Sequence, residues 1–278
     1  MGRRTQPGGA VTTDPRRPFD PARIRAVCFD GYGTLFDFHT VEFRFAVSEL
    51  LADQRIECDH DEFYRSWVSM YGKASPWGGF ARDGEPTDRE RMLSGPLPDW
   101  HSTWEIWRRQ FELAFEKFGV EGDPDSAADH LRHLLSHAPP YPDARETLER
   151  LDGLGFRLGL LSNADEDFLQ SALSLGRLRF SAIQSSESLR AYKPHRAVFL
   201  AICARLGCDP AEVLYVGDSP YSDVNGAHHA GLPTAWVRRA ETDEYPQQVV
   251  RPDVTVAALR ELAALLPPLA GGGTSHAR

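Results

Sequence analysis

Short apolar segments alternate with helical patterns over most of the chain. Each segment is bounded by Gly, Asp, Ser or Pro, which is typical of buried parallel strands. The segments are residues 26–30, 157–163, 181–186, 213–218 and 233–238. Within residues 195–207, Phe199, Ile202 and Leu206 fall on one helical stripe. This alternation predicts an α/β fold with a three-layer, Rossmann-like core, in which helices cover both faces of a parallel sheet.

One long stretch, residues 38–139, breaks this alternation because it contains no convincing buried strand. Its pattern predicts several helices around a Gly- and Pro-rich middle at 75–99. Ser102 and Glu105 have capping-box spacing, which predicts the start of a long helix. The stretch is too long for a strand-to-strand crossover, so we expect a helical cap domain inserted after the first strand. Residues 139–142 (PPYP) would form the hinge back to the sheet.

The chain therefore divides into four predicted parts. Its two ends are rich in Gly and Pro and show no periodicity, so we expect them to be flexible. The parts are an N-terminal tail (1–23), a core (24–37 and 140–266), a helical cap (38–139) and a C-terminal tail (267–278).

Composition narrows the class of protein. The 278 residues carry a net charge of −9, whereas nucleic-acid binding needs a basic face. The sequence contains neither an apolar run of the roughly 20 residues that cross a bilayer nor an apolar stretch at the N-terminus typical of a secretory signal. Its four cysteines show no paired spacing, which favours reduced thiols and a cytoplasmic location. We expect a small-molecule substrate and a monomer or homodimer.

The strongest candidate for chemistry is the segment Asp30-Gly31-Tyr32-Gly33-Thr34, at the end of the first predicted strand. Ligands of open parallel sheets bind beyond the carboxyl ends of the strands. The two glycines would let backbone amides approach an anion beside the carboxylate. Taken alone, Asp30 is equally well explained as the cap of the following helix.

Three further strand ends carry polar side chains. They are Ser162 with Asn163, then Lys193, then Asp218 with Asp223. Alone, Ser162 would be interpreted as a helix cap and Lys193 as a solvated surface residue. Because the carboxyl ends of parallel strands meet at one edge of a sheet, we expect all of these groups to converge with Asp30 on one site.

In these four motifs the sequence resembles the haloacid dehalogenase superfamily of hydrolases, over residues 24–260. The resemblance implies that Asp30 is the nucleophile and that Lys193 neutralises the transferring group, which the substrate-binding residues hold. It implies a Mg²⁺ ion among the oxygens of the acidic residues and the Tyr32 carbonyl. The implied catalytic residues are Asp30, Lys193 and Tyr32; the substrate-binding residues are Thr34, Ser162, Asn163 and Lys193; the metal ligands are Asp30, Tyr32, Asp218 and Asp223.

Tyr32 departs from the phosphatase pattern of this superfamily, which has a second Asp at that position as acid and base. The first motif of this chain, FDGYGTLFD, is similar to that of the 2-haloacid dehalogenase branch, in which a halide leaves without a proton. Tyrosine is a poor acid near neutral pH, because its ordinary pKa is about 10.

The last motif departs from the dehalogenase pattern instead. Asp218 and Pro220 stand where that branch has small neutral polar residues. Dehalogenases of that branch use no metal. Two unit charges about 4 Å apart repel by roughly 4 kcal/mol at an effective dielectric constant near 20. A divalent cation would remove this cost for the three carboxylates. The arginine with which that branch binds the substrate carboxylate has no clear counterpart, although Arg44 and Arg65 are available.

We therefore expect a Mg²⁺-dependent phosphatase that acts on a small phosphorylated metabolite through an aspartyl-phosphate intermediate. Its substrate would have a good leaving group or supply its own acid, or a cap residue would donate the proton. Two alternatives stay open. One is a metal-independent 2-haloacid dehalogenase in which Asp30 attacks carbon, and the other is a non-catalytic binding protein of the same fold. The intact polar residues of all four motifs argue against the last.

Overall fold

The computed structural model describes residues 12–13, 19–75, 89–240 and 243–269. A single sheet of strand order β1-β7-β6-β5-β2-β3-β4 forms its centre. The strands are β1 (Thr12–Thr13), β2 (Ala26–Phe29), β3 (Arg157–Ser162), β4 (Ala182–Ser185), β5 (Val213–Gly217), β6 (Thr234–Val237) and β7 (Val254–Val256). All neighbouring strands pair in parallel except β1, which runs antiparallel to β7. The five predicted strands are confirmed, and β1 and β7 were not predicted.

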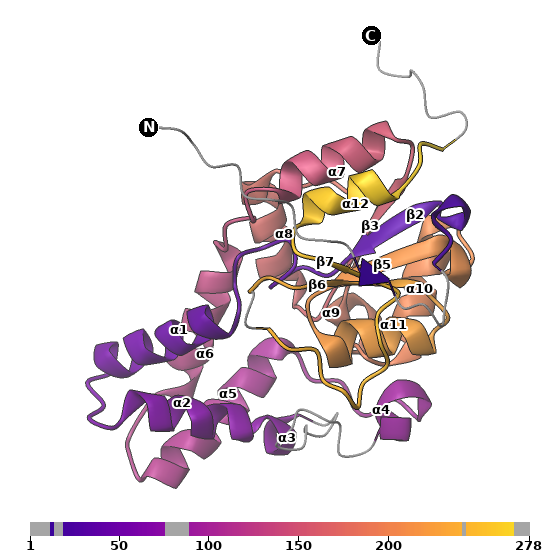
Figure 1. Cartoon of the computed structure of the whole chain (residues 1–278). Helices are drawn as coiled ribbons and strands as arrows, with labels where there is room; N and C mark the ends of the chain where they lie inside the picture. The colour runs from indigo at the N-terminus through magenta and orange to yellow at the C-terminus, as the bar shows by residue number, and fades with distance from the viewer. Residues whose placement is uncertain (1–11, 14–18, 76–88, 241–242, 270–278) are drawn as a thin grey trace, which may run out of the picture.

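Helices surround the sheet and fill the insertion (Figure 1). The helices are α1 (Thr40–Asp53), α2 (His60–Ser69), α3 (Tyr71–Ala74), α4 (Arg89–Ser94), α5 (Thr103–Phe118), α6 (Pro124–Ser136), α7 (Ala144–Gly153), α8 (Glu166–Gly176), α9 (Ser186–Leu189), α10 (Arg196–Leu206), α11 (Gly226–His229) and α12 (Leu262–Leu265). Short 3₁₀ turns cover Pro21–Arg23, Pro210–Glu212 and Leu259–Glu261, and one π-helical turn covers Pro220–Asn225.

The central strand β2 shows why the sheet lies between two layers of helices. All four of its residues are buried. Val27 and Phe29 belong to the core cluster that contains residues of α7, α8 and α12. Ala26 and Cys28 belong to the second cluster, with residues of α10 and α11. Because successive side chains of a strand point to opposite faces, an all-apolar strand needs cover on both sides. The predicted three-layer α/β core is thus confirmed.

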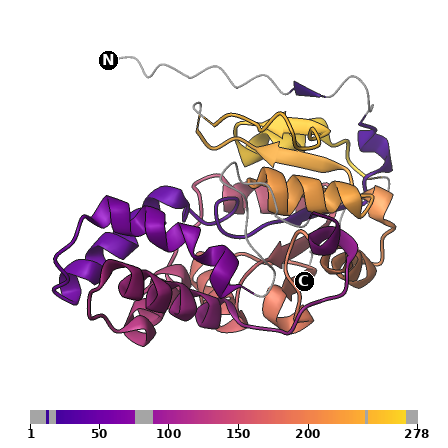
Figure 2. The same cartoon turned by 90° about the horizontal axis from the view of Figure 1, so that it is seen from below.

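Helices α1–α6 form an insertion between β2 and α7, which projects from the sheet in both views (Figures 1 and 2). Its long helix α5 begins at the predicted capping box: Ser102 Oγ accepts from the Glu105 N–H at 3.1 Å, and the Glu105 carboxylate accepts from the Ser102 N–H at 2.7 Å. Trp67 and Trp107 are buried in the core of the insertion. The Gly- and Pro-rich middle lies largely outside the described residues.

The chain enters and leaves this insertion at neighbouring points. The Asp37 N–H donates to the Pro139 carbonyl at 2.8 Å, and the Tyr141 N–H donates to the Leu35 carbonyl at 2.8 Å. These two connections pair as a short bridge between Phe36 and Pro140. The predicted domain boundaries lie at residues 37/38 and 139/140, and the division into separate domains stays a prediction.

The two predicted tails lie mostly outside the described residues. Where they are described, Thr12 and Thr13 pair with β7, and the Leu269 N–H donates to the Leu154 carbonyl at 2.9 Å. In the described part of the chain, every helix is too short or too polar to cross a membrane. The four cysteines form no disulfide.

Candidate active site

The candidate nucleophile Asp30 sits directly after β2, where its N–H donates to the Val216 carbonyl of β5 at 2.9 Å. The chain then turns sharply, because the N–H of Leu35 donates back to the Gly31 carbonyl at 2.7 Å. Gly33 adopts φ +87°, and a Cβ added there would lie 2.6 Å from Oδ2 of Asp218. Only glycine therefore allows this turn to approach the acidic loop after β5.

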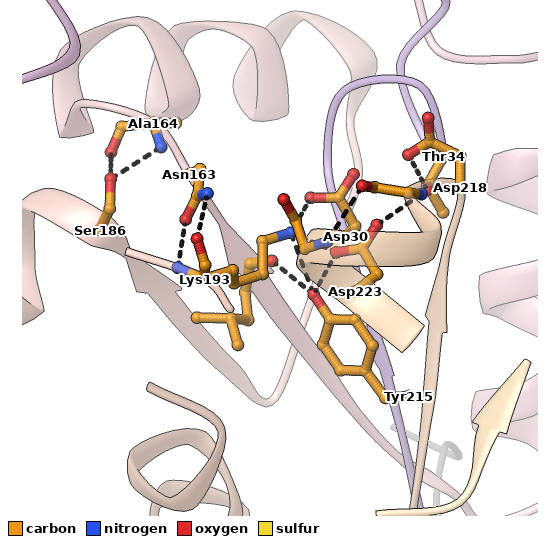
Figure 3. A network of polar contacts seen from close by, with 12 residues as sticks. Asp30, Thr34, Asn163, Ala164, Ser186, Lys193, Tyr215, Asp218 and Asp223 are labelled. Atoms are coloured by element: carbon orange, nitrogen blue, oxygen red, sulfur yellow. Dashed lines mark hydrogen bonds and ion pairs between the residues drawn. The ribbon is translucent and has the colours of Figure 1, made fainter. Parts of the chain in front are cut away.

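Lys193 joins two buried carboxylates, those of Asp30 and Asp223 (Figure 3). Its Nζ donates to Oδ1 of Asp30, and to Oδ1 of Asp223 at 2.7 Å. Its third partner is the hydroxyl of Tyr215, at 3.1 Å. Asp30, Lys193 and Asp223 are 6%, 5% and 1% exposed. Because the charges are shielded from water, each ionised carboxylate depends on this ammonium group.

The pKa values follow from this arrangement. Burial raises the pKa of Asp30, the Asp223 and Asp218 carboxylates raise it further, and Lys193 opposes them. Burial likewise raises the pKa of Asp223 against the effect of Lys193. For Lys193, burial lowers the pKa, but the two carboxylates outweigh it and leave the pKa above its ordinary value. The two carboxylates thus favour the charged form of Lys193.

The third carboxylate, Asp218, follows β5 and faces the same point. Its Oδ1 accepts from the Thr34 hydroxyl at 3.2 Å. Its Oδ2 lies 3.2 Å from Nε2 of His39, which comes from the N-terminus of α1. The hydrogen bond to Asp218 raises the pKa of His39. Asp218 thus links the nucleophile loop with the N-cap residue of α1.

Asp30, Asp218 and Asp223 together fit a divalent cation. Each offers one carboxylate oxygen, and the three oxygens lie within 4.8 Å of one another. Mg²⁺ binds oxygen at about 2.0–2.1 Å and keeps several waters, so small side-chain shifts suffice to bring these oxygens into its shell. Three carboxylates against the one buried ammonium group of Lys193 leave an excess of negative charge for the ion to balance. The Tyr32 carbonyl stays a predicted ligand.

The remaining predicted substrate-binding residues are Ser162, the last residue of β3, and Asn163, which follows it. Ser162 is buried against the nucleophile loop: a Cβ added to Gly31 would lie 2.8 Å from its Oγ. Asn163 uses its side chain to join the two loops, because Oδ1 accepts from the Lys193 N–H at 2.8 Å and Nδ2 donates to the Lys193 carbonyl at 3.2 Å. Asn163 therefore positions Lys193, and its contact with substrate stays a prediction.

Tyr32 contacts the insertion. Its hydroxyl donates toward the carbonyl of Leu135, at the end of α6, at 3.1 Å, and lies 3.4 Å from the carbonyl of Phe168 in α8. Its ring packs against Phe36 and Phe168. Burial raises the pKa of this phenol further above the physiological range. The structure thus gives the side chain a packing role, and a role in catalysis stays a prediction.

The arginines considered for a substrate carboxylate are placed differently. Arg44 forms an ion pair with Asp61 at 2.5 Å, both with side chains about half exposed (57% and 49%). Arg65 is exposed on α2. A third arginine, Arg239, lies at the nucleophile loop, where it donates to the Thr34 carbonyl and pairs with Asp143 at 3.6 Å.

Sequence reasoning missed Tyr215, His39 and Arg239. Tyr215 lies inside an apolar strand, where its hydroxyl gave no signal. His39 follows the first motif closely, so its position in the sequence could have indicated a residue near the site. Arg239 follows β6, a strand end for which the sequence suggested no role.

Comparison with known proteins agrees with this geometry. The family model described as haloacid dehalogenase-like hydrolase matches residues 24–231, which include all the motif residues above. The chain belongs to this family of hydrolases. The acidic cluster and Lys193 lie within the matched residues, and their role as the active site stays a prediction.

Individual relatives include both dehalogenases and phosphatases. The chain is 28% identical to (S)-2-haloacid dehalogenase 4A of Burkholderia cepacia over 218 residues, covering 78% of this chain and 84% of that protein. The structure of L-2-haloacid dehalogenase from Xanthobacter autotrophicus is similar with a TM-score of 0.66 and 25% identity, covering 87% of this chain and 98% of that one. Glyceraldehyde 3-phosphate phosphatase of Methanopyrus kandleri is 31% identical over 170 residues, 56% of this chain and 73% of that protein.

Proposed function

We propose that this hydrolase is a Mg²⁺-dependent phosphatase that uses Asp30 as nucleophile on a small phosphorylated metabolite. The observation that carries the proposal is Asp218, whose carboxylate faces those of Asp30 and Asp223 within 4.8 Å. A third buried or half-buried carboxylate has no role in attack on carbon and adds repulsion. With a divalent cation it completes an oxygen site.

The chain's own residues suit phosphoryl transfer. Asp30 would attack phosphorus and expel the leaving group as its anion, forming an aspartyl phosphate that water then hydrolyses. Lys193 neutralises charge on the phosphoryl oxygens and on Asp30, while Thr34 and Ser162 offer hydroxyl donors to those oxygens. When bound, Mg²⁺ supplies charge neutralisation and orients the phosphoryl group.

This mechanism requires a leaving group that departs without a proton. Tyr32 stands at the position of the usual acid, but its hydroxyl is directed to the Leu135 carbonyl and its pKa is raised. General acid help is worth about 10² to 10⁴ in rate, so a substrate that leaves without protonation gains most from this site. We therefore infer an acyl, enol or aryl phosphate rather than a simple alkyl phosphate.

A second candidate is a 2-haloacid dehalogenase, and the comparisons favour it over the first. The dehalogenase matches extend over the insertion as well as the core, whereas the phosphatase match covers 56% of this chain. Tyr32 also fits a leaving group that needs no proton. Against it stand Asp218, and the engagement of Arg44 with Asp61 and of Arg239 with Asp143.

One pair of assays separates the candidates. The phosphatase hypothesis expects hydrolysis of 4-nitrophenyl phosphate and acetyl phosphate that stops in EDTA and returns with Mg²⁺. The dehalogenase hypothesis expects chloride release from (S)-2-chloropropionate that persists in EDTA. Asp30→Asn should abolish whichever activity exists, whereas Asp218→Asn should abolish only the first. Turnover of neither substrate class, with a ligand or partner retained on purification, would indicate the non-catalytic alternative.

We also propose a cytoplasmic location, as the unpaired cysteines suggest, and a monomer or homodimer. Sedimentation of the purified chain against its mass of 31.1 kDa tests the oligomeric state.

A further inference from the structure

A buried carboxylate of the core caps a helix of the insertion. Asp165 lies in the loop between β3 and α8 and is 6% exposed. Its Oδ1 accepts from the Thr103 N–H at 2.8 Å, and its Oδ2 accepts from the Trp104 N–H at 3.0 Å. These are the first two residues of α5, a helix of 16 residues. The negative charge thus lies at the positive end of that helix.

The first-turn amides of α5 are shared between two caps. The N–H groups of Glu105 and Ile106 donate to the hydroxyl and the carbonyl of Ser102, both at 3.1 Å. The other two go to Asp165, so every amide of this turn has a partner. Asp165 is itself the N-cap residue of α8, yet its side chain caps no amide of α8. An N-cap aspartate ordinarily serves its own helix, whereas this one serves the insertion.

A second core segment holds the same part of the insertion. The Tyr192 hydroxyl donates to the His101 carbonyl at 2.9 Å, and the Tyr192 ring stacks on Trp100 at 5.0 Å. His195 Nε2 lies 3.0 Å from the Gly95 carbonyl. Residues 95–101 are therefore held by core residues on either side of Lys193.

These contacts arise from the loops that carry the catalytic groups. Asp165 follows Ser162 by three residues, and Tyr192 directly precedes Lys193. The side chain of Asn163 bonds to both backbone groups of Lys193, which joins the two loops. A displacement of the insertion at α5 would thus pull on the backbone that places Ser162 and Lys193.

We propose that Asp165 and Tyr192 form a latch that holds the insertion closed on the core, and that Asp165 is a positioning residue for Ser162 and Lys193. Opening the latch would separate the Asp165 carboxylate from the two helix amides that it caps. Docking of the insertion and assembly of the catalytic loops are then a single event. The kinetic part of this proposal rests on the proposed hydrolytic function, whereas the structural part does not.

Hydrogen exchange of the full chain tests the structural part without substrate. Asp165→Ala and Ser102→Ala each remove one cap of the same helix turn, but only the first breaks the link to the core. We expect Asp165→Ala to raise exchange about tenfold in peptides covering residues 190–198, which neither substitution touches. Ser102→Ala should leave these peptides unchanged, and Tyr192→Phe should show a smaller rise.

Kinetics with the substrate class that the wild type hydrolyses tests the positioning role. Asp165→Ala should raise KM about tenfold and change kcat less than about threefold, because bound substrate draws open molecules back to the closed state. Asp165→Asn keeps one acceptor oxygen and should recover part of the loss. If Asp165→Ala and Ser102→Ala give the same exchange at 190–198, the latch is refuted, even when the wild type is active. If the wild type hydrolyses neither phosphates nor haloacids, the proposed function fails and exchange alone decides the latch.

Discussion

The hydroxyl of Tyr215 lies 3.1 Å from Nζ of Lys193, and in turn lies 3.1 Å from the Leu161 carbonyl of β3, to which it donates. The Tyr215 ring is fixed from the other side by Phe199, with the ring centres 5.0 Å apart. Lys193, which neutralises Asp30, is therefore oriented by the side chain of Tyr215, a residue of the sheet strand β5. Its position depends on strand packing as well as on its own loop.

Replacing Tyr215 by Phe tests this orientation. We expect kcat to fall about threefold to tenfold, since Lys193 loses one of its three acceptors, and stability to fall by about 1 kcal/mol. Tyr64→Phe is the matched control, because it removes a hydroxyl bonded to the Thr40 carbonyl within the insertion. Equal kinetic effects of the two substitutions would contradict the assignment.

Lys193→Met should destabilise the protein strongly. It leaves Asp30 and Asp223 buried without their counter-charge, and breaking such a pair costs about 3–5 kcal/mol. Urea unfolding measures the change. Arg108→Met, which breaks an exposed pair with Asp125, should cost less than about 1 kcal/mol. A loss for Lys193→Met as small as that of the control would show that the carboxylates are neutral in the folded protein.

Mg²⁺ should bind to the wild type and stabilise it. At a concentration of 100 times Kd, binding raises the free energy of unfolding by about 2.7 kcal/mol. Asp218→Asn should remove most of this increment, because it removes one anionic oxygen from the cluster. Thermal unfolding with and without Mg²⁺ measures it, and Asp37→Asn, an exposed carboxylate of the same loop, serves as control. No Mg²⁺ effect on the wild type would favour the dehalogenase candidate.

Substitutions of Tyr32 separate packing from proton transfer. Tyr32→Phe removes the hydroxyl contact with Leu135 and should change kcat less than threefold, a proton donor being worth at least about 10². Tyr32→Asp should hydrolyse alkyl phosphates severalfold faster than Tyr32→Phe, because it restores an acid at that position. A large loss of kcat in Tyr32→Phe would identify the phenol as the donor.

Asp165 should make stability depend on pH in a definite direction. Burial raises its pKa, the Glu187 carboxylate raises it further, and the hydrogen bonds from Thr103 and Trp104 oppose this. Its ionised form therefore costs stability at neutral pH, and the cost disappears as pH falls through the folded pKa toward the unfolded value. We expect the wild type to gain stability relative to Asp165→Asn between pH 7 and pH 4. Parallel urea titrations at each pH check the sign, and a wild type that loses stability relative to the variant would contradict it.

The core was predictable because its strands are short apolar runs that end in polar residues. Strand β7 was not predicted because it has only three residues, Val254–Val256, which is too short for a pattern. The convergence of Asp30, Lys193, Asp218 and Asp223 followed from the common edge of parallel strands. That argument locates strand ends, but it does not determine which way a side chain turns.

The contacts that the sequence did not reveal join residues far apart in the chain. Asp165 and Thr103 are separated by 62 positions, and no local pattern links a loop aspartate to the amides of another helix. Asn163 was predicted to bind substrate because of its position at a strand end, yet its amide matches the backbone of Lys193. Such pairings depend on how two loops pack, which composition and periodicity do not encode.

The insertion leaves and rejoins the core where Phe36 lies opposite Pro140, and the residues on either side of this pair are hydrogen-bonded across it. Because the two ends of the insertion lie side by side, its length and helix content can change while the strands on either side keep their registers. Selection can therefore remodel what covers the nucleophile without rebuilding the nucleophile itself.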